Sequence, residues 1–329
     1  MTNKYDNVYI KDSYTIGLTY EGKGPLKDSF DKVFMDNLYY NEKSFEKAEI
    51  KMLNDSINGV IVKSKNKEND IDLIISGDLQ NQIAASDYAI REFNIPFLGI
   101  FNACATYGEG LIIASNFIKN SNYKNIIVST SSHNMVSERQ FRNPTEYGTP
   151  KPEYSTFTAS GAVSTIVTSK KSKIKITSST IGRVMDAKIN DVNNMGAIMA
   201  ISAADTIKRH LNNLNIHEDY YDLILTGDLG KYGEKILIEY MKKDGIDLSS
   251  NYHDCGTMLY DLDEQAVFAG GSGPACSALV TFGYIIKEMR KGKYKRVLYV
   301  PTGAIFSPTM FYQKETIPSI SHAVSLEVI

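Results

Sequence analysis

Two stretches of the chain share one pattern of apolar and polar positions. Three apolar residues at 73–75, in LIISGD, and three at 223–225, in LILTGD, each lead through one small polar residue into Gly-Asp. Short apolar runs that end at a turn are typical of buried parallel strands. The pattern therefore predicts two buried strands, each of which ends at a Gly-Asp turn.

A second pattern also occurs twice, after each of these strands. It begins with FNACATYGEG at Phe101 and with GSGPACSA at Gly271, and each copy predicts a turn, an Ala-Cys pair, a buried helix, a basic loop and a strand. Amphipathic helices at 42–60 and 194–214 precede the two Gly-Asp strands, as right-handed βαβ crossovers require. Because both patterns recur in the same order, we predict two copies of one α/β unit.

Length and charge agree with this division. The chain has 329 residues, 43% of them hydrophobic, which is more than a single core usually organises. We expect two halves, residues 1–172 and 173–329, of mixed α/β class, with helices on both faces of mostly parallel sheets. The net charge is only −2, so the protein as a whole has no field that gathers nucleic acid, and none is expected as a partner.

The cysteines and the longest apolar stretch bear on location. Cys104, Cys255 and Cys276 form no pairing framework, and the N-terminus lacks the apolar core of a secretory signal. A reducing compartment is therefore expected. The uncharged stretch 266–286 is long enough to cross a bilayer, but three glycines and a proline interrupt its first half. A strand, a tight turn and a buried helix are expected there instead of a membrane span.

Cys104 stands directly before a predicted helix. At that position the helix dipole and unpaired backbone N–H groups favour a thiolate, as a nucleophile requires. A small buried thiol used for close packing is the alternative. The residues alone leave both interpretations open.

Duplicated α/β halves, with a cysteine opening the buried helix of the first, resemble the thiolase and ketoacyl-synthase superfamily. The resemblance implies a layered αβαβα sandwich of two pseudo-repeated βαβαβαββ halves and a cysteine that is acylated. It also implies a His in the turn that follows the strand of LILTGDLG, where this chain has Asp228. It implies a His or Asn in the Gly-rich turn of AGGSGPACSA, where this chain has Gly271–Ser272. Losing each such group typically costs about a hundredfold in rate, so a binding role is favoured over condensing chemistry.

A longer series of phrases resembles the stage V sporulation protein AD family of spore-forming bacteria. It includes SGDLQNQ at Ser76, STSSHNMVSERQFRNPTEYG at Ser129 and HDCGTMLY at His253, and it covers nearly the whole chain. The resemblance implies non-enzymatic binding of dipicolinic acid, free or as its calcium chelate, for uptake into the developing spore. It further implies a peripheral place on the inner spore membrane, beside integral components of the uptake apparatus. By analogy with thiolases, a homodimer is expected through the first-half strand after Lys124.

Candidate ligand contacts follow that same strand. Arg139 and Arg142 offer guanidinium groups that suit carboxylates, and His133 offers a donor or a stacking ring. Phe141 and Tyr147 are expected to form an aromatic wall. The alternative is that the arginines pin the loop to its own acids.

Cys104, Asp78, Asp228 and Ser272 complete the predicted ligand-binding set. The two aspartates suit a calcium ion carried by the chelate, although capping of the local turn is favoured for Asp78. No catalytic residue, resident metal or cofactor is expected, and calcium enters only with the chelate. The alternative function is an acyl-thioester transferase or ketoacyl-synthase-like enzyme, with Cys104 as nucleophile and His133 as base. A scaffold with a vestigial cavity is a third possibility.

Overall fold

The computed structural model describes residues 1–142 and 150–329. Each half contributes five strands to a continuous sheet path, in the order β5-β4-β6-β8-β2 in the first half and β11-β10-β13-β16-β9 in the second. The first-half strands are β2 (Tyr9–Gly17), β4 (Leu73–Gly77), β5 (Phe97–Gly99), β6 (Asn125–Ser132) and β8 (Gly161–Thr168). The second-half strands are β9 (Ile174–Thr180), β10 (Leu223–Thr226), β11 (Tyr252–Asp254), β13 (Arg296–Val300) and β16 (Ala323–Val328).

The two sets of strands are arranged alike. When the five strands of each half are numbered in chain order, both sets have the order 3-2-4-5-1 across the sheet. The first three strands of each order run parallel and the last two pairings are antiparallel, in both halves. Within this path the halves join where β2 meets β9, through the residue pairs Tyr9 with Lys175 and Ile10 with Ile174. The repeated sequence pattern therefore has a structural counterpart in strand order and direction.

Short strands complete the sheets. β1 (Thr2–Lys4) pairs with β9, and β3 (Lys32–Val33) pairs with β2. Two small sheets lie apart from this path: β7 (Phe157–Thr158) with β12 (Gly271–Ser272), and β14 (Thr302–Ala304) with β15 (Ser319–Ser321). The β7–β12 pair links the two halves next to the cavity described below.

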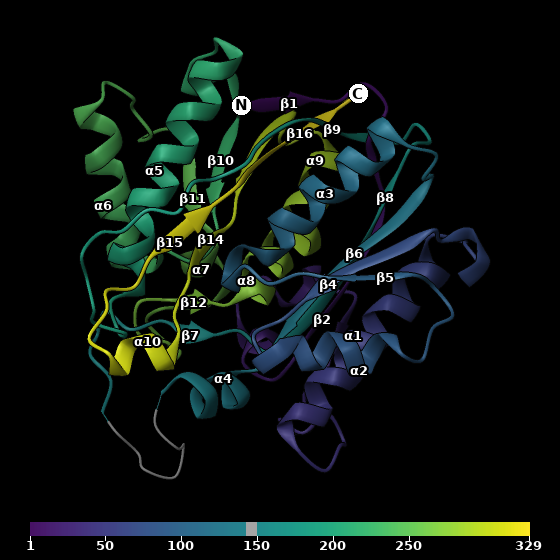
Figure 1. The fold of residues 1–329 in the computed structure, drawn as a ribbon, viewed down its shortest axis with the longest axis horizontal. Coiled ribbons are helices and arrows are strands. Elements are labelled where there is room, and N and C mark those ends of the chain that lie inside the picture. Colours follow the sequence, from purple (N-terminus) through teal and green to yellow (C-terminus); the bar gives the residue numbers. More distant parts are fainter. Residues whose placement is uncertain (143–149) are drawn as a thin grey trace.

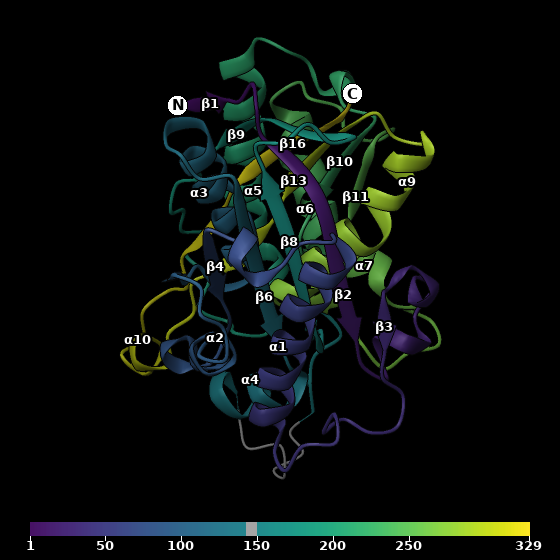
Figure 2. The same cartoon turned by 90° about the vertical axis from the view of Figure 1, so that its right-hand side faces the viewer.

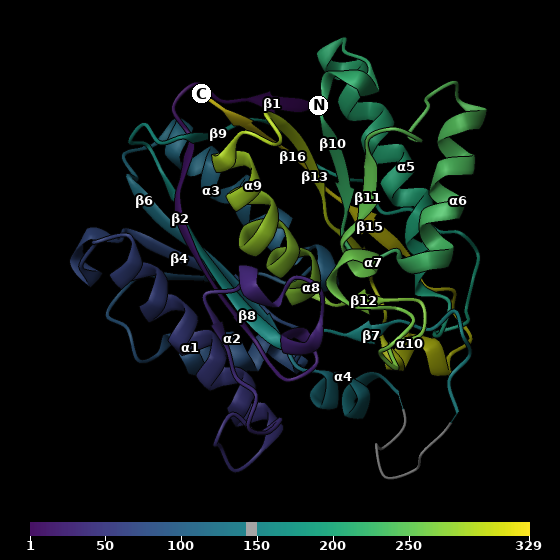
Figure 3. The ribbon, with the colours of Figure 1, turned by 180° about the vertical axis from the view of Figure 1, so that it is seen from behind.

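Helices lie outside and between the two sets of strands (Figures 1 and 3). α1 (Phe45–Lys63) and α2 (Ala84–Ile90) cover the outer face of the first set (Figure 2), and α5 (Met195–Leu214) and α6 (Gly230–Lys243) that of the second. Between the sets lie α3 (Thr106–Asn120) and a longer helical segment. That segment runs through α8 (Pro274–Ala278), a π-helical turn (Leu279–Ile285) and α9 (Ile286–Lys291). The layers confirm the predicted αβαβα fold of thiolase type.

The predicted helices and the apolar stretch occur close to their expected places. α1 begins at Phe45, three residues after the predicted start, because the Ser44 hydroxyl accepts a hydrogen bond from the Lys47 amide and caps the helix. The stretch 266–286 forms β12, a turn at Gly273 with φ of +92°, and the buried helix α8. No helix in the described ranges is long and apolar enough to cross a membrane.

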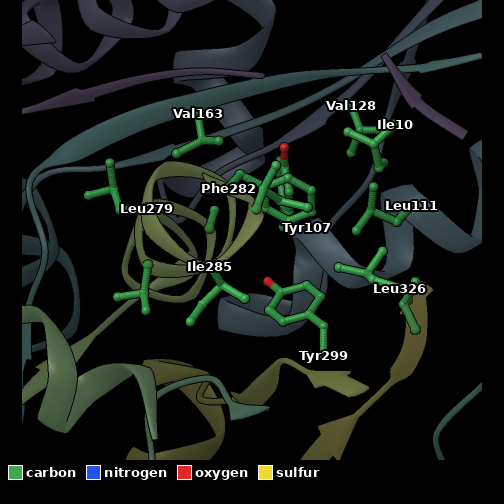
Figure 4. Packing of buried hydrophobic residues seen from close by; sticks show 14 of the residues in the cluster. Ile10, Tyr107, Leu111, Val128, Val163, Leu279, Phe282, Ile285, Tyr299 and Leu326 are labelled. Carbon is green, nitrogen blue, oxygen red and sulfur yellow. The ribbon is translucent and has the colours of Figure 1, made fainter. Parts of the chain in front are cut away.

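The largest core cluster fills the middle layer and joins the halves (Figure 4). Tyr107 and Leu111 of α3 meet Phe282 and Ile285 of the π-helical turn, and the Tyr107 and Phe282 rings pack edge to face with centroids 5.0 Å apart. Gly108 lets α3 also pack closely against the chain after β13, since a Cβ there would stand 2.3 Å from Pro301. Burying such side chains contributes about 1.5–3 kcal/mol each.

The strand predicted to form a dimer interface is an interior strand. β6, which follows Lys124, pairs with β8 on one side over its whole length and with β4 on the other side over residues 126–130. Its backbone groups are already used, so the prediction that this strand pairs with a second copy is wrong. β5 is the edge strand of this half, with β4 on one side and no described strand on the other.

Three short helices remain. α4 (Asn134–Phe141), α7 (Cys255–Leu259) and α10 (Pro308–Tyr312) all lie toward the end of the molecule where β4, β6, β10 and β13 finish (Figure 1). Ligand sites of open α/β sheets lie beyond the carboxyl ends of such strands. α4 and α10 border the cavity at this end.

Candidate functional site

A cavity of about 70 Å³, counted as the space open to the centre of a water molecule, lies where the two halves meet at this end. One water needs only about 10–15 Å³ of such space, so the cavity has room for more than a single water. Its lining mixes apolar walls with a few polar groups: Leu79, Phe101, Ala103, Cys104, Ser137, Glu138, Phe141, Arg142, Thr156, Thr158, Met195, Met199, Ser272, Ala304 and Phe306. Both halves therefore contribute to one site.

Cys104 reaches the cavity from a tight turn. The turn Ala103–Ala105 precedes α3, and the Thr106 hydroxyl fixes it by accepting from the Asn102 amide at 2.9 Å and donating to the Ala103 carbonyl at 2.7 Å. Ala103 has φ of +49°, a left-handed conformation that costs a non-glycine residue on the order of 1 kcal/mol. Strain of this kind concentrates at functional sites, where it positions a neighbouring side chain.

Asp228 lies beneath the cavity floor, fully buried. One carboxylate oxygen accepts from the Ser272 hydroxyl at 3.0 Å and the Gly273 amide at 3.1 Å, and the other accepts from the Thr302 hydroxyl at 2.5 Å. Burial raises the pKa of Asp228 to about 6, against the lowering effect of these donors. The structure thus brings together Cys104, Asp228 and Ser272, as predicted for the site.

The Cys104 thiol is held protonated. Burial, followed by the charge of the nearby Asp228 carboxylate, raises the pKa of Cys104 well above its ordinary value. The thiolate interpretation of Cys104 is therefore not supported. Burial and the Asp228 charge oppose ionisation of the thiol more strongly than the helix end favours it. The arrangement suits a neutral hydrogen-bond donor.

Among the described residues, the charged groups on one wall leave one positive charge in excess. The Glu138 carboxylate meets the Lys151 ammonium at 2.7 Å and the Arg142 Nη1 at 3.6 Å, so two cations share one acid. All three side chains are at most 22% exposed. Arg142 Nη2 donates to the Thr156 carbonyl at 3.4 Å, while its buried Nη1, which faces Glu138, has no acceptor within hydrogen-bond distance in the described ranges.

Apolar side chains form the other walls. Met195 and Met199 come from α5, and Phe141 and Phe306 meet edge to face with centroids 5.9 Å apart. Such a slot suits a flat aromatic ring. Phe141 therefore lies where the aromatic wall was expected, whereas Tyr147 falls outside the described residues.

His133 lies away from this lining and is fully buried. Its Nδ1 accepts from the Met135 amide at 3.2 Å and caps α4, which leaves the proton on Nε2 to donate to the Leu38 carbonyl at 2.8 Å. Burial lowers the pKa of His133 to about 4. Both ring nitrogens are engaged, so this histidine has neither a free donor for a ligand nor a free base for Cys104.

Arg139 also points elsewhere. Its guanidinium meets Glu46 at 3.3 Å and lies over the Phe45 ring, 5.2 Å from the centroid. This contact with α1 matches the alternative in which a loop arginine pins the loop to an acid. The two arginines of one loop therefore have different surroundings, and only Arg142 lines the cavity.

Asp78 occupies the first-half Gly-Asp turn and is fully buried away from the cavity lining. Its two oxygens accept from the Gln80 and Ser86 amides, each at 2.8 Å. Buried Glu49 lies nearby, and burial followed by the Asp78 charge raises the pKa of Glu49. Asp78 thus has the capping geometry that was favoured for it.

Sequence reasoning missed three polar groups around the Cys104 turn. Thr302 of β14 donates to Asp228. The Nε2 atom of His322 lies 2.9 Å from the side-chain amide nitrogen of Asn102. The Nδ1 atom of the same ring accepts from the Gly182 backbone amide at 3.1 Å. No local pattern marks these residues, since the contacts join positions far apart in the chain. In the described ranges no three His, Cys, Asp or Glu side chains gather as a metal site.

Comparisons with known proteins agree with this fold and extend it. A family model described as Stage V sporulation protein AD (SpoVAD) matches residues 2–327. Stage V sporulation protein AD of Bacillus subtilis (strain 168) is 45% identical over 320 residues, covering 97% of this chain and 94% of that protein.

Two solved structures are similar in fold at low sequence identity. A variant of OleA of Xanthomonas campestris is 12% identical with a TM-score of 0.66, and the match covers 98% of this chain and 97% of that one. The 3-oxoacyl-[acyl-carrier-protein] synthase III of Aquifex aeolicus VF5 is 13% identical with a TM-score of 0.56, covering 97% and 99%. At these identities the likeness concerns the fold alone.

Proposed function

The chain belongs to the stage V sporulation protein AD family, and we propose that it is a non-enzymatic receptor for dipicolinic acid, pyridine-2,6-dicarboxylate. Dipicolinate is flat, aromatic and doubly negative near neutral pH. The cavity between the halves is the proposed site, and uptake of this ligand into the developing spore is the proposed role.

Among the described residues, Arg142 and Lys151 share the single acid Glu138 beside the cavity, and this excess of positive charge is the observation that carries the proposal. Arg142 Nη1 is buried 3.6 Å from Glu138, too far for a hydrogen bond, so a closer acceptor is favourable there. A carboxylate supplies it, and a charge-assisted bond of this kind contributes about 1.5–3 kcal/mol. Glu138 cannot neutralise Arg142 alone, because Lys151 stands closer to it.

We place the rest of the ligand by the same reasoning. The pyridine ring lies between the Phe141 and Phe306 rings and the Met195 and Met199 side chains. The second carboxylate is placed at the floor beside Ser272 and Cys104, and the Ser272 hydroxyl then turns to it from Asp228, to which it donates in the free protein. Both groups are uncharged, which suits an anion more than a thiolate does.

The same floor disfavours catalysis. Acyl transfer through a cysteine needs a thiolate or a neighbouring base. No histidine belongs to the described cavity lining, and the carboxylate beside Cys104 raises the pKa of the thiol. Binding without turnover is therefore the function we propose.

Isothermal titration calorimetry tests the ligand. Dipicolinate is expected to give saturable heat, while picolinate, with one carboxylate, should bind at least tenfold more weakly, because it cannot reach both the Arg142 wall and the floor. Titrations with and without calcium separate the free acid from the chelate. Absence of heat at millimolar dipicolinate would contradict the proposal.

Intact mass spectrometry tests the alternative enzyme. Its support is the condensing-enzyme fold together with a cysteine in the cavity. Incubation with acyl-thioesters of several chain lengths should leave the mass of the protein unchanged if it only binds. An adduct on Cys104, with turnover of the thioester, would establish the enzyme instead.

Two further partners belong to this proposal. The integral components of the spore uptake apparatus are proposed to hold the chain at the inner spore membrane. A homodimer is proposed through the edge strand β5. Leu98 of this strand is 37% exposed, and Phe101, two residues after its end, is 49% exposed. Exposed apolar edges favour pairing with another chain, and sedimentation of a Leu98→Lys variant against wild type tests it.

A further inference from the structure

Three loops at the end of the molecule opposite the cavity are strongly basic. Residues 119–124 (KNSNYK), 169–175 (SKKSKIK) and 290–296 (RKGKYKR) carry two, four and five Lys or Arg residues and no acid. The whole chain carries a net charge of −2. The charge is therefore distributed unevenly, with basic residues concentrated in these loops.

The three loops form one surface. The Ser169 amide donates to the Lys124 carbonyl, the Lys173 ammonium donates to the Arg290 carbonyl, and Ile329 and Val328 bond to Lys173 and Lys295. The first loop leads into β6, the second joins β8 to β9, and the third leads into β13 beside β16. All three lie near the chain termini at the top of Figure 1, whereas α4 and α10 mark the cavity end at the bottom.

Several lysines of this surface have no acidic partner in the described part of the chain. Lys124, Lys170, Lys171 and Lys295 are exposed, and none of their ammonium groups has a hydrogen bond or an ion pair there. Lys170 also stands close enough to Lys11 to lower the pKa of Lys11, after burial. Uncompensated repulsion of this kind destabilises a free protein and is relieved by an anionic partner.

The nearby acids do not cancel this charge. Asp72 and Asp222 accept from backbone amides at the starts of β6 and β13, at 2.6–2.8 Å. Glu288 pairs with Lys291 and Lys293, and Asp12 pairs with Lys63 and Arg290. Glu327 lies opposite Lys175 and Arg296 in the strand register and accepts from the Thr177 and Tyr220 hydroxyls at 2.8 and 3.1 Å. These acids are used locally, and in the described ranges none of them pairs with the ammonium groups of Lys170 or Lys171.

Tyrosines alternate with the basic residues. Tyr123, Tyr284 and Tyr294 are half-buried here, and the Lys293 ammonium lies over the last two rings at 5.8 and 5.2 Å. Tyrosine and lysine together suit the headgroup level of a bilayer, because both have an apolar body and a polar tip.

We infer that this basic end, formed by residues 119–124, 169–175 and 290–296, docks on a bilayer surface rich in anionic lipid headgroups, with the ligand cavity facing away from that surface. The inference deepens the peripheral membrane role proposed above. It does not depend on which molecule fills the cavity. Each lysine near an anionic surface contributes about 1 kcal/mol, and the attraction decays within a Debye length.

Flotation of the full chain with lipid vesicles tests the inference. Wild type is expected to float with vesicles of phosphatidylcholine and phosphatidylglycerol at about 0.1 M salt, to release at about 0.5 M salt, and not to float with phosphatidylcholine alone. The triple variant Lys170→Glu, Lys171→Glu, Lys295→Glu should lower the partition coefficient about 100-fold.

A matched control carries the same charge change at the other end. Lys43, Lys231 and Lys235 are exposed and have no acidic partner in the described ranges, and their replacement by Glu should change partitioning by less than about threefold. Dipicolinate calorimetry on both triple variants reports folding and separates the two proposals. A basic-end variant that still binds dipicolinate but no longer floats supports the docking face. Wild type that binds vesicles but gives no heat with dipicolinate contradicts only the proposed dipicolinate receptor.

Three results would overturn the docking face. Wild type that fails to float with anionic vesicles is the first. Equal partitioning of the basic-end and control variants is the second. The third is capture by random-sequence duplex DNA at the same salt and equal strength, which would assign the surface to polyanions in general.

Discussion

The two Gly-Asp turns have nearly the same sequence and opposite surroundings. Asp78 accepts from two backbone amides and caps its own turn and α2, out of reach of the cavity. Asp228 accepts mostly from hydroxyls and stands beneath Cys104 and Ser272 at the cavity floor. One copy of the repeat therefore holds the scaffold, while the other shapes the site.

The largest expected effect separates these roles through stability. Asp78→Ala leaves two buried amides without acceptors, at about 1–3 kcal/mol each, so unfolding free energy should fall by about 3 kcal/mol in urea titrations. Asp228→Ala should cost clearly less, because hydroxyls rotate toward other acceptors or cavity water while amides cannot. Equal losses for the two variants would remove the distinction.

Arg139 of α4 and Arg142, directly after α4, show the same contrast: the first contacts the scaffold and the second lines the site. Arg142→Gln should weaken dipicolinate binding about 50-fold by calorimetry, since it removes a charge-assisted bond in the cavity. Arg139→Gln is the matched control and should leave affinity within about threefold, because that guanidinium contacts Glu46 and Phe45. The reverse ranking would move the site toward α1.

The pH dependence sharpens the role of Asp228. Its folded pKa of about 6 lies above the ordinary carboxyl value near 4, so the folded chain binds more protons than the unfolded chain between these values. Stability from this group is therefore complete below about pH 4 and is lost as pH rises through about 6. Between about pH 5 and 7.5 the loss should be about 1.4 kcal/mol.

Asp228→Asn keeps the oxygen acceptor and should flatten that part of the stability profile, as denaturant titrations at several pH values will measure. The raised pKa of Glu49, beside Asp78, adds a separate loss as pH rises. Glu49→Gln should remove that contribution and leave the Asp228 window in place. An unchanged profile in Asp228→Asn would place the titrating group elsewhere.

The smallest expected effect concerns His133. His133→Asn keeps an oxygen that caps α4 but loses the bond from Nε2 to the Leu38 carbonyl, so unfolding free energy should fall by about 1 kcal/mol, with the loss visible as a lower thermal midpoint. His133→Ala removes the cap as well and should lose about 1 kcal/mol more. A large loss of ligand affinity in both variants, without a loss of stability, would return this residue to the site.

Much of the site could not be predicted because its contacts are distant in sequence. Cys104, Asp228 and Ser272 stood out through the repeats, and Arg142 through its loop. Sequence patterns did not separate Arg142 from Arg139, because the two side chains differ only in what folds against them. The Asn102–His322 and Asp228–Thr302 contacts join residues 220 and 74 positions apart.

Local patterns in the chain were sufficient to define the class of fold, the duplication and the strands that end at each Gly-Asp turn, because hydrophobic periodicity and turn residues act over short distances. How each copy of the repeat is used depends on packing between the halves. Burial and neighbouring donors made Asp78 a cap, kept the Cys104 thiol protonated and left Arg142 facing a cavity. Those surroundings are set by side chains from elements far apart in the chain, and no local pattern encodes them.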